Sequence, residues 1–136
     1  MEKDYLAERF CAQWQACAGT NPDQVWRRLH AHYQEPHRHY HTLAHIAHCL
    51  GQLDIAREHV AEFSATEMAI WFHDIIYHYG ARDNEILSVA YFRGLADATM
   101  SPSFIDRVSE FIIATQHAGA ASDPAIRRDI LMSNRE

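Results

Sequence analysis

The residues best suited to chemistry in this chain are a histidine and an aspartate that stand side by side in an apolar setting. His73 and Asp74 directly follow the apolar run 68–72. Removing such a pair from water is unfavourable unless a charge binds both side chains. A divalent metal ion meets that need, because imidazole nitrogen and carboxylate oxygen both coordinate transition metals. The pair therefore predicts a metal site.

A second histidine motif precedes this pair in the segment Tyr40-His41-Thr-Leu-Ala-His45. If the segment is helical, His41, His45 and His48 lie within roughly 60° of one another, since a helix turns about 100° per residue. They would form a polar stripe beside an apolar one. The stripe predicts a ligand and a spare proton carrier on one helical face.

Two helices that face each other can deliver His45, His73 and Asp74 to a single ion, with a further ligand from elsewhere and room for water. An isolated histidine on a helix is more often a surface residue or a satisfied core residue. The metal interpretation depends on the two motifs occurring in order, on separate helices, each within apolar sequence. These three residues are the predicted metal ligands.

The elements that must position these residues are predicted to be helices. Proline follows a helix-capping residue three times, at Asn21-Pro22, Ser101-Pro102 and Asp123-Pro124. This order is typical of helix starts. Ser64-Ala-Thr-Glu67 has the pattern of a capping box, and Asp83 or Asn84 can cap one more helix.

The spacing of apolar residues agrees with these starts. The first two helices are predicted at about residues 4–18 and 22–33, and a third begins near His41. The predicted inward faces are Leu6, Phe10, Trp14 and Cys17; Val25 and Leu29; Leu43, Ile46, Ala47, Leu50 and Leu53; Met68, Ala69, Phe72 and Ile76; Ile86, Ala90 and Leu95; Phe104, Ile105, Val108, Phe111, Ile112 and Thr115; and Ile126, Ile130 and Leu131. No segment alternates like a strand. The sequence predicts an all-α fold, a single compact domain of six or seven helices over residues 1–136.

Charge and composition limit the classes of molecule that the protein is expected to bind. The formal net charge is −6, which disfavours a long surface for polymeric nucleic acid but allows one small phosphorylated molecule. The sequence contains no run of 18 apolar residues, so we expect no membrane-spanning helix. The segment Met1–Tyr5 lacks the features of a signal peptide. Three cysteines without a close pair are typical of a reduced protein. We expect a cytoplasmic protein without a membrane partner, and a homo-oligomer stays open.

The two motifs resemble the signature segments of the HD superfamily of metal-dependent phosphohydrolases. The resemblance lies in Tyr40-His41-Thr-Leu-Ala-His45-Ile and Trp71-Phe-His-Asp-Ile-Ile-Tyr77. The stretch from Arg38 through Asp83-Asn-Glu85 to Ala114-Thr-Gln-His117 is similar to a bacterial branch of that superfamily, the predicted metal-dependent HD-domain phosphohydrolases. The likeness covers about residues 24–131, with core motifs over 38–131. The first segment is also similar to the Tyr-His-Asn-x-x-His motif of cyclic-nucleotide phosphodiesterases.

The resemblance implies a compact HD-like helical domain and a role for each motif residue. By analogy with the phosphodiesterase motif, His41 protonates the leaving group. His45, His73 and Asp74 become metal ligands, in agreement with the interpretation from the residues themselves.

The superfamily's last metal ligand is an aspartate on a later helix. The resemblance offers Asp123 or Asp129 for this role. Asp129 is our choice, because it lies inside a predicted helix whose apolar residues can orient it. Asp123 is better explained as a helix cap before Pro124.

Three further polar residues carry two interpretations each. Glu85 is either an acid favoured at a helix N-terminus or an acid or base near the metal-bound water. Arg38 either pairs with a substrate phosphate or is a solvated loop residue. His117 either favours a helix C-terminus or lines the substrate pocket, as the resemblance implies.

The expected chemistry is hydrolysis of a small phosphate ester, with a nucleotide as an example by analogy. The metal activates water and neutralises phosphoryl charge, Asp74 binds the ion and orients the water, and His41 donates a proton. Mixed nitrogen and oxygen ligands suit Mn²⁺, Fe²⁺, Co²⁺, Ni²⁺ or Zn²⁺ better than Mg²⁺. One alternative is a di-iron oxygenase on the same scaffold, with His117 and Glu85 as added ligands. Another is a catalytically inactive HD domain that binds a ligand.

Overall fold

The computed structural model describes the backbone of residues 2–121 and the side chains of residues 4–116. Within that range the chain is helical and contains no strand. Its elements are α1 (Glu2–Ala16), α2 (Pro22–Tyr33), α3 (Leu43–Ile55), a 3₁₀ turn η1 (Arg57–His59), α4 (Phe63–Phe72), α5 (Asn84–Ala96) and α6 (Pro102–Ala121). The predicted all-α fold is confirmed. The predicted helix around Ile126, Ile130 and Leu131 lies outside the described residues.

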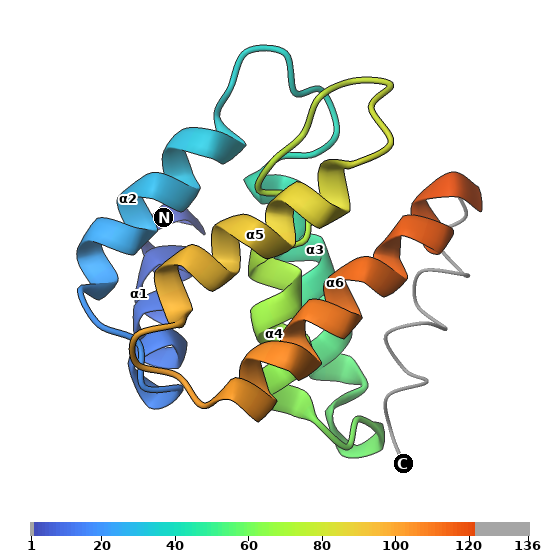
Figure 1. The fold of residues 1–136 in the computed structure, drawn as a ribbon. Coiled ribbons are helices and arrows are strands. Elements are labelled where there is room, and N and C mark those ends of the chain that lie inside the picture. The colour runs from blue at the N-terminus through green and yellow to red at the C-terminus, as the bar shows by residue number, and fades with distance from the viewer. Residues whose placement is uncertain (1, 122–136) are drawn as a thin grey trace.

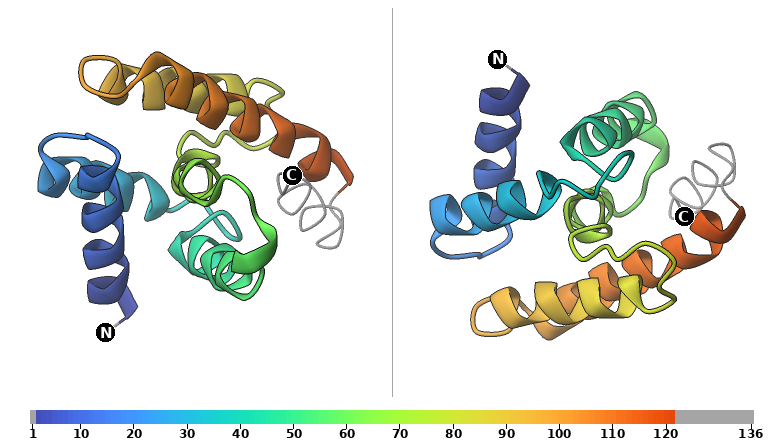
Figure 2. Two further views of the ribbon diagram at one scale, coloured as in Figure 1. Left: turned by 90° about the horizontal axis from the view of Figure 1, so that it is seen from below. Right: turned by 90° about the horizontal axis from the view of Figure 1, so that it is seen from above.

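Helix α4 is the centre of the arrangement. It contacts α1, α3, α5 and α6, and Figure 1 shows it behind α5 and α6. In both views of Figure 2 it is seen nearly end-on with other helices on several sides. Every residue from Ala65 to Phe72 is buried. A helix that is apolar all round must be enclosed by other elements, so the run 68–72 forms the middle of the core.

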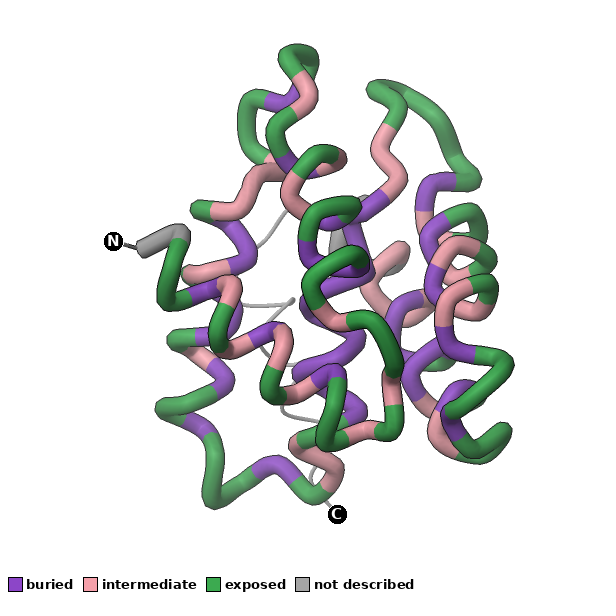
Figure 3. Tube along the Cα trace, turned by 90° about the vertical axis from the view of Figure 1, so that its left-hand side faces the viewer, coloured by how far each residue is buried: buried purple, intermediate pink, exposed green. Residues whose placement is uncertain are grey.

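The predicted inward face of α1 is confirmed for three of its four residues, whereas Cys17 follows the helix and is only partly buried. Leu6, Phe10 and Trp14 are all buried. The ring of Phe10 meets the edge of Trp71 at a centroid distance of 5.3 Å, and it lies 6.0 Å from Trp26. Edge-to-face ring pairs stabilise a core beyond their buried area. Figure 3 shows the buried residues gathered along the inner sides of the helices.

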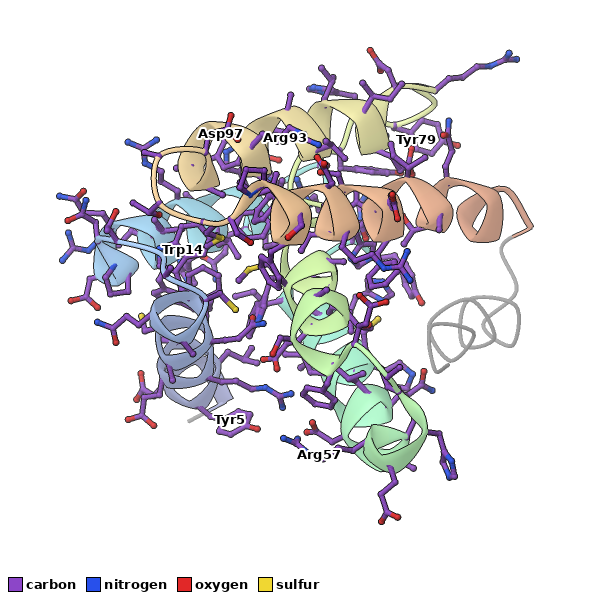
Figure 4. All side chains as sticks on the ribbon, turned by 60° about the horizontal axis from the view of Figure 1, so that its bottom comes forward. Tyr5, Trp14, Arg57, Tyr79, Arg93 and Asp97 are labelled. Carbon is purple, nitrogen blue, oxygen red and sulfur yellow. The ribbon has the colours of Figure 1, made fainter. Side chains whose placement is uncertain are left out.

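The turn after α1 depends on close packing against Trp14. The N–H of Gly19 donates to the carbonyl of Trp14 at 2.8 Å, and Ala18 has a φ of 72°. This is the pattern of a Schellman cap, although the left-handed position holds alanine rather than glycine. The indole N–H of Trp14 donates to the carbonyl of Thr20 at 2.8 Å, which brings the ring over Gly19. Figure 4 shows Trp14 at the junction of α1 and α2.

Two of the predicted helix starts are confirmed at their prolines. Pro22 opens α2 and Pro102 opens α6, but the side chain of Asn21 makes no capping hydrogen bond and its φ is 53°, so the predicted cap at Asn21 is wrong. The hydroxyl of Ser101 accepts the N–H of Phe104 at 3.3 Å, so serine caps α6 as expected. The third proline-marked start, at Asp123-Pro124, lies outside the described residues.

The predicted capping box at residues 64–67 is wrong. Helix α4 begins at Phe63, so Ser64 lies inside the helix. The carboxylate of Glu67 accepts the Nε–H of Arg9 at 2.9 Å and the indole N–H of Trp71 at 3.3 Å. Glu67 therefore ties α1 to α4, because a nearly buried carboxylate needs charged and polar partners.

The predicted inward face of α5 is also wrong in large part. Ile86 is 57% exposed and Ala90 is exposed, whereas Leu95 packs at the edge of the core. The buried residues of α5 are Asn84, Ser88, Phe92 and Ala96. The first half of the helix thus turns a polar face inward.

The loop between α4 and α5 explains this polar face. Helix α4 ends at Phe72, so Ile76 belongs to the loop and not to the helix, contrary to the prediction. The N–H of Ile76 donates to the hydroxyl of Ser88 at 3.1 Å, and the amide of Asn84 binds both backbone groups of His78 at 3.0 Å. Buried backbone groups without helical partners require such side chains.

Among the described residues, no helix combines the length and the apolar character needed to cross a membrane.

Gly19→Ala tests how closely the turn between α1 and α2 packs against Trp14. A Cβ at Gly19 would lie 2.4 Å from the indole of Trp14, so we expect the free energy of unfolding to fall by about 1–3 kcal/mol. Gly51→Ala is the matched control: it meets nothing within 4 Å inside α3, so we expect a gain of about 0.5–1 kcal/mol. Urea denaturation measures both. Equal stability of the two variants would contradict the prediction.

Candidate metal centre

The site lies where α4 ends. The helix stops at Phe72, and the next two residues, His73 and Asp74, are buried. The last carbonyls of a helix have no helical partners. Here the backbone N–H of His73 donates to Ala69 at 2.8 Å and that of Ile75 donates to Phe72 at 3.1 Å. The ring Nδ1 of His73 binds the carbonyl of Ile70 at 2.8 Å. One of the predicted ligands thus helps to cap its own helix.

Side chains from a distant segment complete the capping. The hydroxyl of Tyr33, at the end of α2, donates to the carbonyl of Trp71 at 2.8 Å. The guanidinium of Arg38 donates to the carbonyls of Asp74 and Ile75, each at 2.6 Å. Figure 1 shows the two loops that meet here, residues 34–42 and 73–83, side by side at one end of the molecule. A cation at a helix C-terminus also matches the helix dipole.

The three predicted ligands come together. His45, His73 and Asp74 are all buried, and each offers one ligand atom within 4.8 Å of the other two. Nε2 of His73 lies 3.2 Å and Nε2 of His45 lies 3.7 Å from Oδ2 of Asp74. Two ligand atoms of one ion with bonds near 2.1 Å stand about 3–3.5 Å apart. The His73–Asp74 distance falls in this range and the His45–Asp74 distance lies just above it, so these three residues, called the ligand trio below, could hold a metal ion.

The orientation of His73 supports this interpretation. A carbonyl oxygen only accepts hydrogen bonds, so the Nδ1 that faces Ile70 carries a proton. The remaining nitrogen, Nε2, points at the carboxylate of Asp74. Either a proton or a metal ion must lie between these two atoms, because both otherwise present lone pairs. A carbonyl on the second nitrogen is a common way of orienting a metal-bound histidine.

The carboxylate of Asp74 is held in its charged form. Burial by itself raises the pKa of Asp74. The charge of His73 and the hydrogen bonds from His41 and His73 lower the pKa by more than burial raises it. The pKa of Asp74 therefore lies well below its usual range. An ionised carboxylate in this position can exchange a shared proton for a metal ion, since metal binding releases protons from its ligands.

His41 lies at the exposed edge of the ligand trio. Its Nδ1 is 2.9 Å from Oδ2 of Asp74, and its side chain is 20% exposed. Its ring stacks on Tyr77 with centroids 4.1 Å apart. The predicted histidine stripe is wrong, because α3 begins at Leu43 and His41 precedes it, while His48 is exposed. The loop nevertheless places His41 next to the carboxylate.

His45 reaches the ligand trio from α3. Its ring lies 4.7 Å from that of Tyr40, which is 57% exposed, and its Nε2 is 3.7 Å from the thiol of Cys49. Cys49 follows one helical turn later and is buried. Sequence reasoning found neither neighbour. The spacing of four residues between His45 and Cys49 was the available signal.

The remaining predicted site residues are Glu85, Arg38, His117 and Asp129, and the structure describes the side chains of the first two. Glu85 lies in the first turn of α5, where the helix dipole favours an acid; its predicted action near the metal-bound water stays a prediction. Arg38 is buried rather than solvated: its side chain is 0% exposed and its guanidinium donates to backbone carbonyls, while its predicted contact with a substrate phosphate stays a prediction. His117 lies in α6, but its side chain falls outside the described residues. Asp129 falls entirely outside them.

Comparison of the chain with protein-family models, with curated proteins and with solved structures found no match. The likeness to HD phosphohydrolases therefore remains a prediction from the two motifs, and the geometry of the ligand trio is the independent observation beside it.

Proposed function

We propose that this chain is a metal-dependent phosphohydrolase that cleaves a small phosphate ester. The observation that supports the proposal is the convergence of His45, His73 and Asp74, all buried, with His41 at the edge of the same carboxylate. Sequence motifs far apart in the chain predict these four side chains. Their meeting at one point is what a metal-assisted reaction requires.

The ligand trio fits a divalent transition metal. Two imidazole nitrogens and one carboxylate oxygen form a mixed set that suits Mn²⁺, Fe²⁺, Co²⁺, Ni²⁺ or Zn²⁺. Three protein ligands leave further positions for water and substrate. We propose Asp129 as a fourth ligand from the resemblance alone.

The residues of the site have separate roles in this proposal. A bound ion would supply an activated water and neutralise charge on the phosphoryl oxygens. Asp74 orients that water and accepts the Nδ1–H of His41 at 2.9 Å. With Nδ1–H held by Asp74, Nε2 of His41 faces the substrate, and in the imidazolium form its proton would pass to the departing oxygen and leave a neutral ring. The partial exposure of His41 gives a substrate access to it.

The proposed substrate is small and phosphorylated. The net charge of −6 disfavours long nucleic acids, because those are bound through basic surfaces. A phosphate group can bind directly to the ion, so no arginine is needed for its charge. Arg38, engaged with carbonyls of the protein, is not part of this proposal. We keep a nucleotide as the example to be tested first.

Substitution of the ligand trio tests the proposal. We expect purified wild-type protein to bind a transition metal stoichiometrically, and His45→Ala and Asp74→Ala to lose it together with activity. His41→Ala should keep its metal but lower kcat by about 100-fold or more, because only the proton donor is lost. Elemental analysis and a screen of phosphomonoesters and nucleotides with added Mn²⁺, Co²⁺ and Zn²⁺ give both readouts.

His48→Ala is the matched control for these variants, since His48 lies on α3 one turn from His45 but is exposed. It should bind metal and turn over like the wild type. Full activity in all three site variants would refute the assignment. Oxygen consumption after anaerobic loading with iron, without hydrolysis, would replace the phosphohydrolase by an oxygenase. Metal-free protein that hydrolyses nothing in the screen would leave a ligand-binding domain.

Metal binding should also stabilise the fold. An ion present at about 100 times its dissociation constant adds about 2.7 kcal/mol to the free energy of unfolding, because it binds only the folded site. We expect Zn²⁺ or Mn²⁺ to raise the melting temperature of the wild type and EDTA to reverse the shift. Asp74→Asn, nearly the same shape without the charge, should melt at the same temperature with and without metal. A shift of equal size in Asp74→Asn would place the ion elsewhere.

A further inference from the structure

Arg38 is the most completely enclosed charge beside the ligand trio. Its side chain is 0% exposed. It makes four hydrogen bonds: Nε donates to Glu35 at 3.0 Å, one terminal nitrogen donates to the carbonyls of His41 at 3.0 Å and Asp74 at 2.6 Å, and the other donates to Ile75 at 2.6 Å. A buried cation is tolerated only when it is paired and hydrogen-bonded in this way.

These bonds join the two halves of the site. Arg38 binds the backbone of His41 in its own loop and the backbone of Asp74 in the loop after α4. The side chains of the same two residues meet at 2.9 Å. One guanidinium therefore fixes the separation of the backbones that carry the predicted proton donor and a predicted ligand.

We propose that Arg38 is a positioning residue for the metal centre, which clamps the loop of His41 to the loop of Asp74 without touching the ion or the substrate. The inference rests on the proposed metal-binding function and deepens it. It replaces the predicted contact between Arg38 and a substrate phosphate.

The shape of the guanidinium makes this role specific to arginine. Its planar fork presents several N–H donors in fixed directions, whereas a lysine ammonium is a compact point charge. The group also lies 5.0 Å from the ring centre of Tyr33 and 5.9 Å from that of Tyr77. Tyr77 in turn stacks on His41. Lysine at position 38 cannot reproduce both the bonds to the carbonyls and the contacts of the guanidinium with the two tyrosine rings.

The charge of Arg38 is balanced from the outer side. Glu35, 34% exposed, binds Nε and also lies 3.5 Å from His32 and 3.7 Å from His37. Glu35 touches none of the ligand trio in these contacts, so its substitution reaches the site only through Arg38. This makes Glu35→Gln a milder variant of the same clamp.

The experiment compares metal affinity with stability. Arg38→Met and Arg38→Lys are the test variants. Arg93→Met removes an arginine from an exposed ion pair with Asp106, and Leu6→Ala destabilises the core of α1 away from the site. Dissociation constants for Zn²⁺ and Co²⁺ are measured by competition with a chelator, at a temperature where each variant is folded. The absorption spectrum of bound Co²⁺ reports the ligand geometry.

We expect Arg38→Met and Arg38→Lys to weaken Zn²⁺ binding by about tenfold or more and to alter the Co²⁺ spectrum, as loss of an orienting partner does at other metal sites. Both control variants should bind within about twofold of the wild type, because loss of stability alone does not move the ligands of a folded site. If Arg38→Met binds like Leu6→Ala, the clamp is only structural and the inference is wrong. If Arg38→Met does not fold, Glu35→Gln decides: weaker binding by about threefold supports the clamp and unchanged binding overturns it.

Amide hydrogen exchange separates this inference from the proposed function. In metal-free protein, Arg38→Met should accelerate amide exchange in residues 73–78 by about tenfold relative to Leu6→Ala. Without the guanidinium that binds the carbonyls of Asp74 and Ile75, this loop should open more often and expose its N–H groups to water. Unchanged exchange overturns the clamp whether or not metal binds. Wild-type protein that binds no metal overturns the proposed function, and the exchange result then judges Arg38 alone.

Discussion

A buried carboxylate surrounded by imidazoles is the interaction on which the site depends. Asp74 is almost fully removed from water, and Oδ2 lies within 3.7 Å of nitrogen atoms from His41, His45 and His73. An isolated carboxylate at such a depth would be neutral. The charge of His73 and the hydrogen bonds from His41 and His73 lower its pKa and keep it ionised. The rest of the molecule holds these groups at that spacing.

Ending α4 at the correct residue is the structural counterpart of this constraint. The helix is enclosed by its neighbours as far as Phe72, and its last carbonyls are each given a partner. Those partners include Tyr33 from another helix and a ring nitrogen of His73 itself. Because capping and ligand orientation use the same atoms, the end of the helix and the site cannot be altered separately.

Sequence reasoning predicted the parts of the structure that depend on simple periodicity and on unusual residue pairs. The core face of α1 and the convergence of His45, His73 and Asp74 could be predicted, since a histidine and a carboxylate within apolar sequence must meet other polar groups or an ion. The inward face of α5 could not, because Ser88 is buried to serve a backbone N–H of Ile76, a loop residue twelve positions earlier. The surroundings of Arg38 could not be predicted for the same reason, because a sequence shows the charge but not which carbonyls surround it.

The central position of α4 has a consequence for the durability of the site. Proteins open in cooperative units, and the segments with the most buried contacts open last. Helix α4 packs against α1, α3, α5 and α6, and His73 and Asp74 directly follow its last buried residue, so we expect their positions to be among the last to open. His41 lies on a partly exposed loop, and we expect that loop to open earlier. In the function proposed above, the ion would therefore be held beside the enclosed helix, whereas the proton donor would lie on the segment that opens more easily.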